Sequence, residues 1–527
     1  MGAAFFSRFP LEAMAQSSAP GSDNWDRGAV RHLLPTVSDS RILLKVSFDQ
    51  PLSEAPVLRI DGRSYAGRMS DTAGEFWQFF AADLASEQQH TLSLYEAGGT
   101  SLCEPWPLST FPSPDSRPEQ FRMLFYTCAG GVAGEWEGPG QWENYLPTAI
   151  RNRLLRRALS FAPDAVVANG DHIYWDLHYS RGANAGKLTE YARQSDFDYA
   201  ANVLATKNEL GVKKAAGPQI MPVYGVDFRS TPMFFLQDDH DHWENDGVSD
   251  EIATYPIAWF QLQLARATQR LYYPEFLPDA RRPAGLPWSG ADDRGDVSES
   301  FGTVRYGDLA EVLLYDVRRT MNLAGPNAIF VDAQVEKWLI DRSRAYDTRH
   351  LVHAPSNPFG WSAGKWGEWY PDILDRDAGE LTTRIEKPYW QEGWLRQHDR
   401  LAAAMASRIE RAPLTISGDL HTMCAGQIHR AGTIDLGHNP INAVVSGPIG
   451  TRRQGFISMS RGIGATPPQH LDVDNAFTPR EDHGFTLIDF LRDKIVLRQF
   501  AWDADREPPE AIDHLQPFHT AELEPPA

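Results

Sequence analysis

Residues of the types that bind metal ions follow four short apolar segments of the sequence. They are Cys128 at the end of MLFYTC (123–128), Asp171 after AVVA (165–168), Asp239 and His240 after MFFL (233–236), and Asp419 and His421 at the end of LTISGDLH (414–421). Carboxylates and imidazoles are common metal ligands, and loops at strand ends commonly carry active sites. A single Asp after a strand is more often a turn residue or a helix cap, but four such strand ends together predict a metal centre.

The apolar segments before these residues have the pattern of buried strands. Further strands are predicted over EVLLYDVR (311–318), AVVS (443–446), FTLIDF (485–490) and KIVLRQF (494–500). Helices are predicted after Pro147 and, from the spacing of apolar residues, over 333–341 and 394–409. This mixture predicts an α/β (α+β) fold, with a layered sheet core flanked by helices.

The sequence before the first of these strands divides into two parts. Residues 1–39 are rich in Ser, Pro, Asp and Gly and predict a loose lead-in segment. Residues 40–118 predict a small all-β, sandwich-like domain that ends in a Pro/Ser linker, with a hairpin at Asp61-Gly62. Residues 119–527 are predicted to form the catalytic domain.

Bulk composition limits the classes of partner. The chain has 527 residues and a net charge of -20, which would repel the phosphate backbone of a nucleic acid. No apolar run approaches the roughly 18 to 20 residues that span a bilayer. Three cysteines argue against a disulfide framework. The N-terminus has neither a twin arginine nor a long apolar core, so a cytoplasmic location is favoured. The oligomeric state stays open.

Three motifs resemble, in order along the chain, those of the PhoD-like phosphatases within the calcineurin-like and purple-acid-phosphatase group. They are NGDHIYWD (169–176), LQDDHDHW (236–243) and LTISGDLH (414–421). Three further segments, YTC (126–128), LLYDVRRTM (313–321) and DAQVEKWL (332–339), are similar to other parts of that family. The resemblance runs from about residue 121 to 500. It implies a metallophosphoesterase β-sandwich core, and the small β domain also fits the family.

The resemblance also implies a role for each site residue. Asp171 would bridge metals, and Tyr174 and Cys128 would bind a ferric ion as phenolate and thiolate. The other ligands would be Asp239, Asp419 and His421. The implied centre is di- or multinuclear and holds Fe³⁺ plus Ca²⁺, with Zn²⁺ or Mn²⁺ as alternatives. His240 would reach the phosphate or the leaving group, and Arg318 would neutralise substrate oxygens.

Several of these residues also have purely structural interpretations. Cys128 could be a small core residue, Tyr174 a core aromatic, Asp238 a loop-holding residue and Arg318 a member of a structural ion pair. His172, Asp241, His242 and Cys424 are predicted to support the ligands. The segment WGEWY (366–370) resembles the family's aromatic-acidic segment near the pocket, with surface packing as the competing account.

One position departs from the family pattern. The family often has an Asp two residues after the Cys, where this chain has Gly130. One ligand is therefore absent there, unless Glu135 or Glu137 in the loop 129–140 supplies it.

The predicted function is metal-dependent hydrolysis of small phosphate esters, either phosphomonoesters or phosphodiesters, by a metal-activated hydroxide. Bound cations would make a site rich in carboxylates attractive to an anionic substrate. Two alternatives stay open, namely a phosphotriesterase-type esterase and a non-catalytic cation-binding scaffold. The family resemblance leaves a periplasmic or secreted location open.

Overall fold

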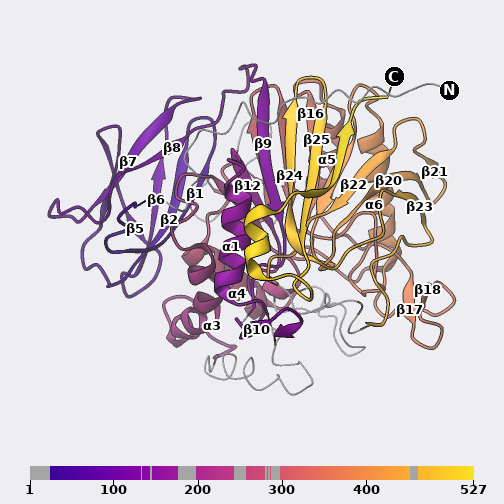
Figure 1. The fold of residues 1–527 in the computed structure, drawn as a ribbon, viewed down its shortest axis with the longest axis horizontal. Coiled ribbons are helices and arrows are strands. Elements are labelled where there is room, and N and C mark those ends of the chain that lie inside the picture. The colour runs from indigo at the N-terminus through magenta and orange to yellow at the C-terminus, as the bar shows by residue number, and fades with distance from the viewer. Residues whose placement is uncertain are drawn as a thin grey trace.

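Two large sheets form the centre of the molecule (Figure 1). The computed structural model describes residues 24–131, 133–142, 145–175, 197–242, 257–278, 282, 285–286, 297–450, 458 and 461–526. The six-stranded sheet has the order β13 (Met233–Leu236), β12 (Ala165–Asn169), β9 (Gln120–Tyr126), β24 (His483–Leu491), β25 (Ile495–Trp502) and β26 (Pro517–Leu523). The eight-stranded sheet has the order β14 (Phe301–Tyr306), β15 (Ala310–Tyr315), β16 (His350–Pro355), β19 (Leu414–Ser417), β22 (Ile441–Val445), β20 (Cys424–Ala431) and β21 (Ile434–Asp435), and β23 (Leu471–Asn475) pairs with β20.

The two sheets pack face to face as a β-sandwich. Alternate residues along a strand point to opposite faces of its sheet. Phe125 and Val167 of the six-stranded sheet therefore share one buried core with Leu314 and Ile416 of the eight-stranded sheet. Their sequence neighbours face outward and meet the helices on either side.

Helices cover both outer faces of the sandwich. The six-stranded sheet packs against α1 (Thr148–Leu159), α3 (Lys207–Tyr224) and α4 (Trp259–Tyr272), and the eight-stranded sheet against α5 (Ala333–Arg344) and α6 (Glu392–Ala406). Pro147 precedes α1, as predicted, and the predicted helices over 333–341 and 394–409 correspond to α5 and α6. None of the described helices is long and apolar enough to cross a bilayer. The predicted α/β class, with a sheet core between helical layers, is confirmed.

Shorter described elements surround the sandwich. They are β10 (Trp136–Gly138), β11 (Gln141–Trp142), β17 (Ile373–Asp375), β18 (Glu380–Thr382) and the 3₁₀ turns η2 (His240–His242), η3 (Gly325–Asn327) and η4 (Pro509–His514).

A separate pair of four-stranded sheets lies beside the sandwich, in indigo in Figure 1. One contains β1 (Val30–Val37), β2 (Ile42–Phe48), β6 (Phe76–Ala81) and β5 (Arg68–Met69). The other contains β4 (Arg63–Ala66), β3 (Val57–Ile60), β7 (Gln89–Tyr95) and β8 (Trp106–Ser109). The predicted hairpin is present, and Asp61 and Gly62 at its turn both have positive φ.

The start of this β domain differs from the prediction. Strand β1 occupies Val30–Val37, inside the segment 1–39 that was expected to be a loose lead-in. Burial explains the difference, since all but one residue of the strand is buried against β2 and the neighbouring core. The domain is anchored to the sandwich by Lys45, which is fully buried and lies 2.9 Å from Glu275. The division at residue 118 stays a prediction.

Parallel pairing brings the chemically important turns to one edge. Strands β9, β12 and β13 are mutually parallel, as are β15, β16, β19 and β22. Their carboxyl ends therefore lie together, and the two sheets are joined there by a bridge between Thr127 and Pro448. The metal-ligand types named from the sequence follow β9, β12, β13 and β19 at this edge.

Candidate metal centre

The predicted ligands lie in turns just beyond the strands, on strained backbone. Cys128, Asp171, Asp419 and His421 all have positive φ, between 50° and 70°. Non-glycine residues rarely adopt this conformation, and it concentrates at functional sites where the surroundings enforce it. Strands β9 and β19 end at Tyr126 and Ser417, earlier than the predicted segments 123–128 and 414–421. The ligands thus belong to the turns and point away from the strand ladders.

Asp171 is at the centre of the first group of ligand types. Its Oδ2 accepts hydrogen bonds from Cys128 Sγ at 3.3 Å and from the Tyr174 hydroxyl at 3.2 Å. The same hydroxyl lies 3.1 Å from His421 Nε2, which is 3.7 Å from Asp171 Oδ2. All four side chains are buried. A carboxylate, a thiol, a phenol and an imidazole from three turns that are distant in the sequence therefore converge on one point.

Two further groups adjoin the first. The three groups are Cys128, Asp171 and His421; Asp171, Asp239 and His240; and Asp238, Asp239 and Asp419. In each group the potential ligand atoms lie within 4.8 Å of one another. Asp171 and Asp239 each belong to two groups, which is the arrangement that bridging carboxylates require. The structure brings all six predicted ligands together, and their role as ligands stays a prediction.

The donor set fits a bound cation. Oδ1 of Asp171, Oδ1 of Asp239 and Oδ2 of Asp238 are buried and accept no hydrogen bond within the described part of the chain. A buried carboxylate oxygen without a partner is costly, and a cation would satisfy it. His421 is buried away from water, which lowers the pKa of its imidazole. The neutral imidazole, which is the form that metals bind, is therefore favoured.

The thiol and phenol need that cation in order to ionise. Burial raises the pKa of Cys128 and of Tyr174 well above their ordinary values, and the Asp171 carboxylate adds to both shifts. Without a cation both groups therefore keep their protons, and both lie within hydrogen-bonding distance of Asp171 Oδ2. A metal ion reverses this balance, because it stabilises thiolate and phenolate directly.

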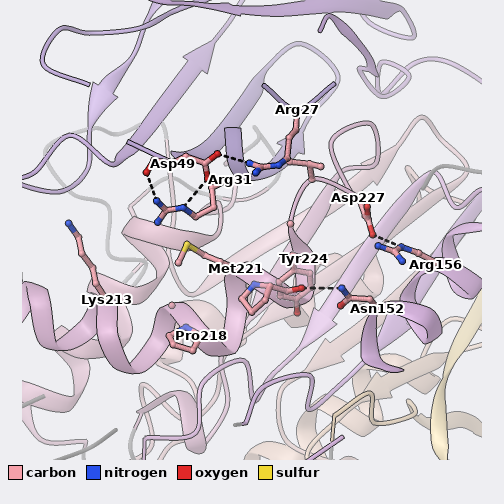
Figure 2. Close-up of a pocket in the computed structure, with 14 residues that line it drawn as sticks. Arg27, Arg31, Asp49, Asn152, Arg156, Lys213, Pro218, Met221, Tyr224 and Asp227 are labelled. Carbon is pink, nitrogen blue, oxygen red and sulfur yellow. Dashed lines mark hydrogen bonds and ion pairs between the residues drawn. The ribbon is translucent and has the colours of Figure 1, made fainter. Parts of the chain in front are cut away.

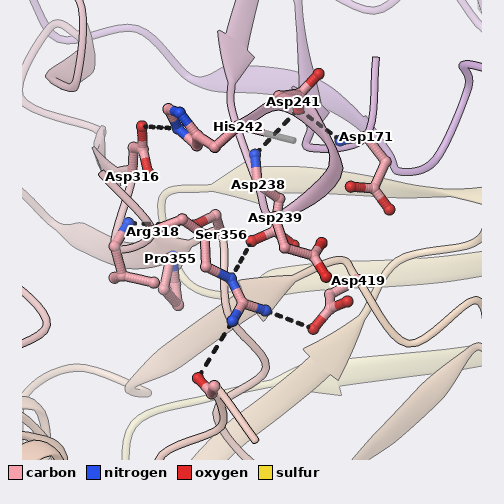
Figure 3. Close-up of polar contacts among 12 residues, drawn as sticks. Asp171, Asp238, Asp239, Asp241, His242, Asp316, Arg318, Pro355, Ser356 and Asp419 are labelled. Carbon is pink, nitrogen blue, oxygen red and sulfur yellow. Dashed lines mark hydrogen bonds and ion pairs between the residues drawn. The ribbon is translucent and has the colours of Figure 1, made fainter. Parts of the chain in front are cut away.

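Asp241 holds the ligand-bearing turns in place. Its carboxylate accepts hydrogen bonds from the backbone N–H groups of Asp171 at 2.8 Å, His172 and Ile173 at 2.9 Å, and Asp238 at 3.0 Å. One buried side chain thus ties the turn after β12 to the turn after β13 (Figure 3). The sequence analysis predicted such a supporting role for Asp241.

Asp241→Ala is expected to destabilise the protein by about 3–5 kcal/mol, because four buried N–H groups lose their acceptor. Asp241→Asn is expected to cost less, since the amide keeps one oxygen acceptor. Denaturant unfolding of both variants and the wild type measures the difference. Equal stability of Asp241→Ala and the wild type would contradict this role.

Arg318 and Lys365 place two positive charges among these carboxylates. Arg318 is fully buried and donates from Nε to Asp238 Oδ1 at 2.6 Å and from Nη2 to Asp419 Oδ2 at 2.9 Å (Figure 3). Lys365 Nζ lies 3.3 Å from Asp239 Oδ2 and also contacts Asp419 Oδ1. Burial would raise the pKa of Asp239, but Lys365 and His240 hold it below its ordinary value. Sequence reasoning missed Lys365, although it directly precedes the WGEWY segment.

The remaining residues named from the sequence have identifiable contacts. The His240 ring centroid lies 4.2 Å from that of Tyr174, beside the second group. His172 Nε2 is 2.7 Å from the Leu236 carbonyl, and His242 Nε2 is 3.1 Å from Asp316 Oδ2. Cys424 is buried in β20 and is in none of the three groups. The WGEWY segment is not on the surface, because Trp366, Trp369 and Tyr370 are buried.

Gly130 cannot be replaced by the family's Asp without a rearrangement. A Cβ atom at Gly130 would lie 2.4 Å from the carbonyl oxygen of His172, because the turn after β12 passes directly over it. Glu135 and Glu137 are exposed and are in none of the three groups. The suggestion that they replace the absent ligand is therefore wrong.

A surface cavity elsewhere has different chemistry. It has a volume of about 590 Å³ and lies between β1, α1 and α3 (Figure 2). None of its lining residues is a predicted site residue. Its arginines are neutralised, since Arg27 and Arg31 pair with Asp49, and Arg156 with Asp227. The turns at the sheet edge therefore stay the candidate functional site.

Comparison with solved structures identifies the fold. PhoD matches with a TM-score of 0.60 and 13% identity, over 95% of this chain and 91% of that chain. The purple acid phosphatase PPD1 from seeds of yellow lupin (Lupinus luteus) matches with a TM-score of 0.51 and 12% identity, over 94% and 73% of the two chains. No protein-family model and no curated protein matches the sequence. The chain shares the fold of these two solved structures, and the predicted resemblance to the PhoD-like phosphatases is confirmed at the level of the fold.

Proposed function

We propose that this protein is a metal-dependent hydrolase of phosphate esters. The observation that carries the proposal is the set of three adjoining ligand groups, which share Asp171 and Asp239 and lie beside Arg318 and His240. Metal-dependent hydrolysis of a phosphate ester needs several metal ligands close together, and it also needs side chains that contact the phosphoryl group and the leaving oxygen. The likeness of the fold to PhoD and to a purple acid phosphatase supports the same assignment.

The ligand types favour particular metal ions. A hard trivalent ion such as Fe³⁺ suits the phenol of Tyr174 together with Cys128, Asp171 and His421, and Ca²⁺ suits the carboxylates of Asp171 and Asp239 in the second group. Zn²⁺ or Mn²⁺ are the alternatives. When bound, such ions polarise the phosphoryl oxygens and lower the pKa of a coordinated water.

The side chains around the ligands have separate tasks. Arg318 is enclosed by Asp238 and Asp419, so it contributes a fixed positive charge close to the phosphoryl group. His240 lies against Tyr174 at the border of the first two groups, where a protonated imidazole can give its proton to the leaving oxygen. No step needs a covalent bond between substrate and protein.

A panel of chromogenic esters tests the proposal. The full chain, loaded with iron and calcium, is assayed with a phosphomonoester, a phosphodiester and a phosphotriester of one leaving group. Turnover of the monoester or diester is expected to exceed that of the triester. Faster turnover of the neutral triester would establish the phosphotriesterase alternative, and metal binding without turnover of any ester would establish the cation-binding scaffold.

Tyr174→Phe tests the identity of the metal. A phenolate bound to Fe³⁺ gives a visible charge-transfer band, whereas Zn²⁺ has a filled d shell and gives none. The wild type is expected to be coloured, and Tyr174→Phe is expected to lose or shift that band while the fold survives, because only a hydroxyl is removed. Absorption spectra of the wild type and the variant measure the charge-transfer band. A colourless, fully active wild type containing zinc or calcium alone would refute the ferric assignment.

A further inference from the structure

Asp419 has both carboxylate oxygens engaged by cationic side chains. Oδ2 accepts a hydrogen bond from Arg318 at 2.9 Å, and Oδ1 contacts the ammonium of Lys365. Asp419 is 4% exposed and Lys365 is 8% exposed, so little water screens these contacts. A metal ion at Asp419 would have to compete with both partners.

The same two cations neutralise the whole third group. Arg318 bonds to Asp238 and Asp419, while Lys365 contacts Asp239 and Asp419. Each of the three carboxylates therefore already has a positive partner on one oxygen or both. A further divalent ion among them would lie within a few ångströms of two fixed positive charges and would be repelled.

The Asp171 side of the site is different. The Asp171 carboxylate contacts the thiol of Cys128, the phenol of Tyr174 and the imidazole of His421, and its Oδ1 accepts no hydrogen bond within the described part of the chain. Oδ1 of Asp239, the oxygen opposite the one that meets Lys365, is similarly without a partner there. Among the carboxylates of the three groups, the oxygens without a hydrogen-bond partner in the described part of the chain are therefore one each on Asp171, Asp239 and Asp238, and none is on Asp419.

Lys365 is held rigidly in its position. The carboxylate of Glu368 accepts hydrogen bonds from the backbone N–H groups of Lys365 and Ala363, both at 3.1 Å, and from the Ser362 hydroxyl. Glu368 is itself fully buried. This closed turn fixes the start of the Lys365 side chain, so the ammonium is part of the built site rather than a mobile surface charge.

We propose that Lys365 and Arg318, organised by Asp419, take the place of a metal ion in the third group. Metal binding is confined to the side of Asp171 and Asp239, and Asp419 positions the two cations in place of binding a metal. The exclusion of a metal ion does not depend on the proposed function, whereas the effect on ester selectivity described next rests on it. The built-in charges favour esters that carry a negative charge, so Lys365 contributes to the choice of anionic esters over neutral ones.

Metal content separates this arrangement from one in which Asp419 is a ligand. The full chain and its variants are equilibrated with iron and calcium, passed through a desalting column and analysed by mass spectrometry for metal per chain. Asp419→Asn is expected to keep the wild-type metal content, while Asp171→Asn loses metal. Lys365→Met is expected to gain about one divalent ion per chain, and the matched Lys365→Arg variant, which keeps the charge, is expected to gain none.

Two results would overturn the proposal. Metal loss in folded Asp419→Asn equal to that in Asp171→Asn would make Asp419 a ligand. An unchanged metal content in Lys365→Met would show that the lysine does not exclude an ion. Circular dichroism shows whether Asp419→Asn is folded. If it is not, the metal contents of Lys365→Met and Lys365→Arg are sufficient to decide between the two arrangements.

Activity is measured separately, which keeps the two proposals distinguishable. Lys365→Met is expected to lower kcat/KM for a diester at least about tenfold more than for a triester of the same leaving group, whereas Lys365→Arg changes this ratio little. An equal loss for both esters would overturn the selectivity role. If the metal contents of the wild type and the variants are as expected but the wild type hydrolyses no ester, the proposed function is refuted and the metal assignment stands.

Discussion

Asp171→Asn is expected to abolish metal binding and ester hydrolysis together. Asp171 belongs to two of the three ligand groups, and Cys128, Tyr174 and His421 all converge on its Oδ2. An amide offers a single neutral oxygen and cannot bridge two cations. A bound metal supplies several kcal/mol of transition-state stabilisation, so its loss is expected to lower kcat/KM by about 10³-fold or more.

Kinetics with a chromogenic diester and metal analysis of the same preparation measure both effects. Asp341→Asn is a matched control, because Asp341 is exposed on α5 and pairs only at the surface with Lys337. The control is expected to keep both metal and activity. Activity of Asp171→Asn within tenfold of the wild type would overturn the metal assignment and the proposed function.

The main strands and helices of the sandwich follow from the sequence because their apolar patterns are local. Short apolar runs such as 165–168 and 233–236 form the parallel strands β12 and β13, and Pro147 marks the start of α1. The motif residues after those strands meet because parallel strands place their carboxyl ends at one edge. Order along the chain therefore predicts proximity for residues such as Asp171 and Asp239.

Features that depend on contacts between distant segments could not be predicted in this way. Strand β1 has no clear alternation, since His32 and Pro35 interrupt it, and it is fixed by pairing with β2. Lys365 reaches the carboxylates only because Glu368 closes its turn. The absence of an Asp at position 130 is explained by the backbone of His172, which lies next to Gly130 only in the folded chain.

Asp238 illustrates the same limit within a recognised motif. The family resemblance selects Asp239 as the ligand, but the spacing of the residues alone gives no sign of which of the two faces the metals. In the structure Asp238 pairs through Oδ1 with Arg318, whereas Asp239 shares two ligand groups. Neighbouring residues in a turn point in different directions, so spacing alone does not assign their roles.

His240→Ala is expected to lower the rate of hydrolysis by roughly 10²- to 10⁴-fold, the usual contribution of a general acid or base. His240 is 6% exposed, and its ring lies against Tyr174 beside the second ligand group. A group that gives its proton to the leaving oxygen matters most when that oxygen is a strong base. The loss is therefore expected to be largest for alkyl esters and smaller for aryl esters with acidic phenols.

The dependence on the leaving group separates a proton donor from a metal ligand. His240→Ala and the closer-sized His240→Gln are compared with the wild type across a series of leaving groups, and the metal content and visible spectrum of each protein are recorded. Both variants are expected to keep metal and colour and to show a steeper dependence of rate on leaving-group pKa. Loss of metal, with rates reduced equally across the series, would instead place His240 among the ligands of the second group, with Asp171 and Asp239. The outcome matters for the mechanism, because in that case the leaving oxygen would have to take its proton from a source other than His240.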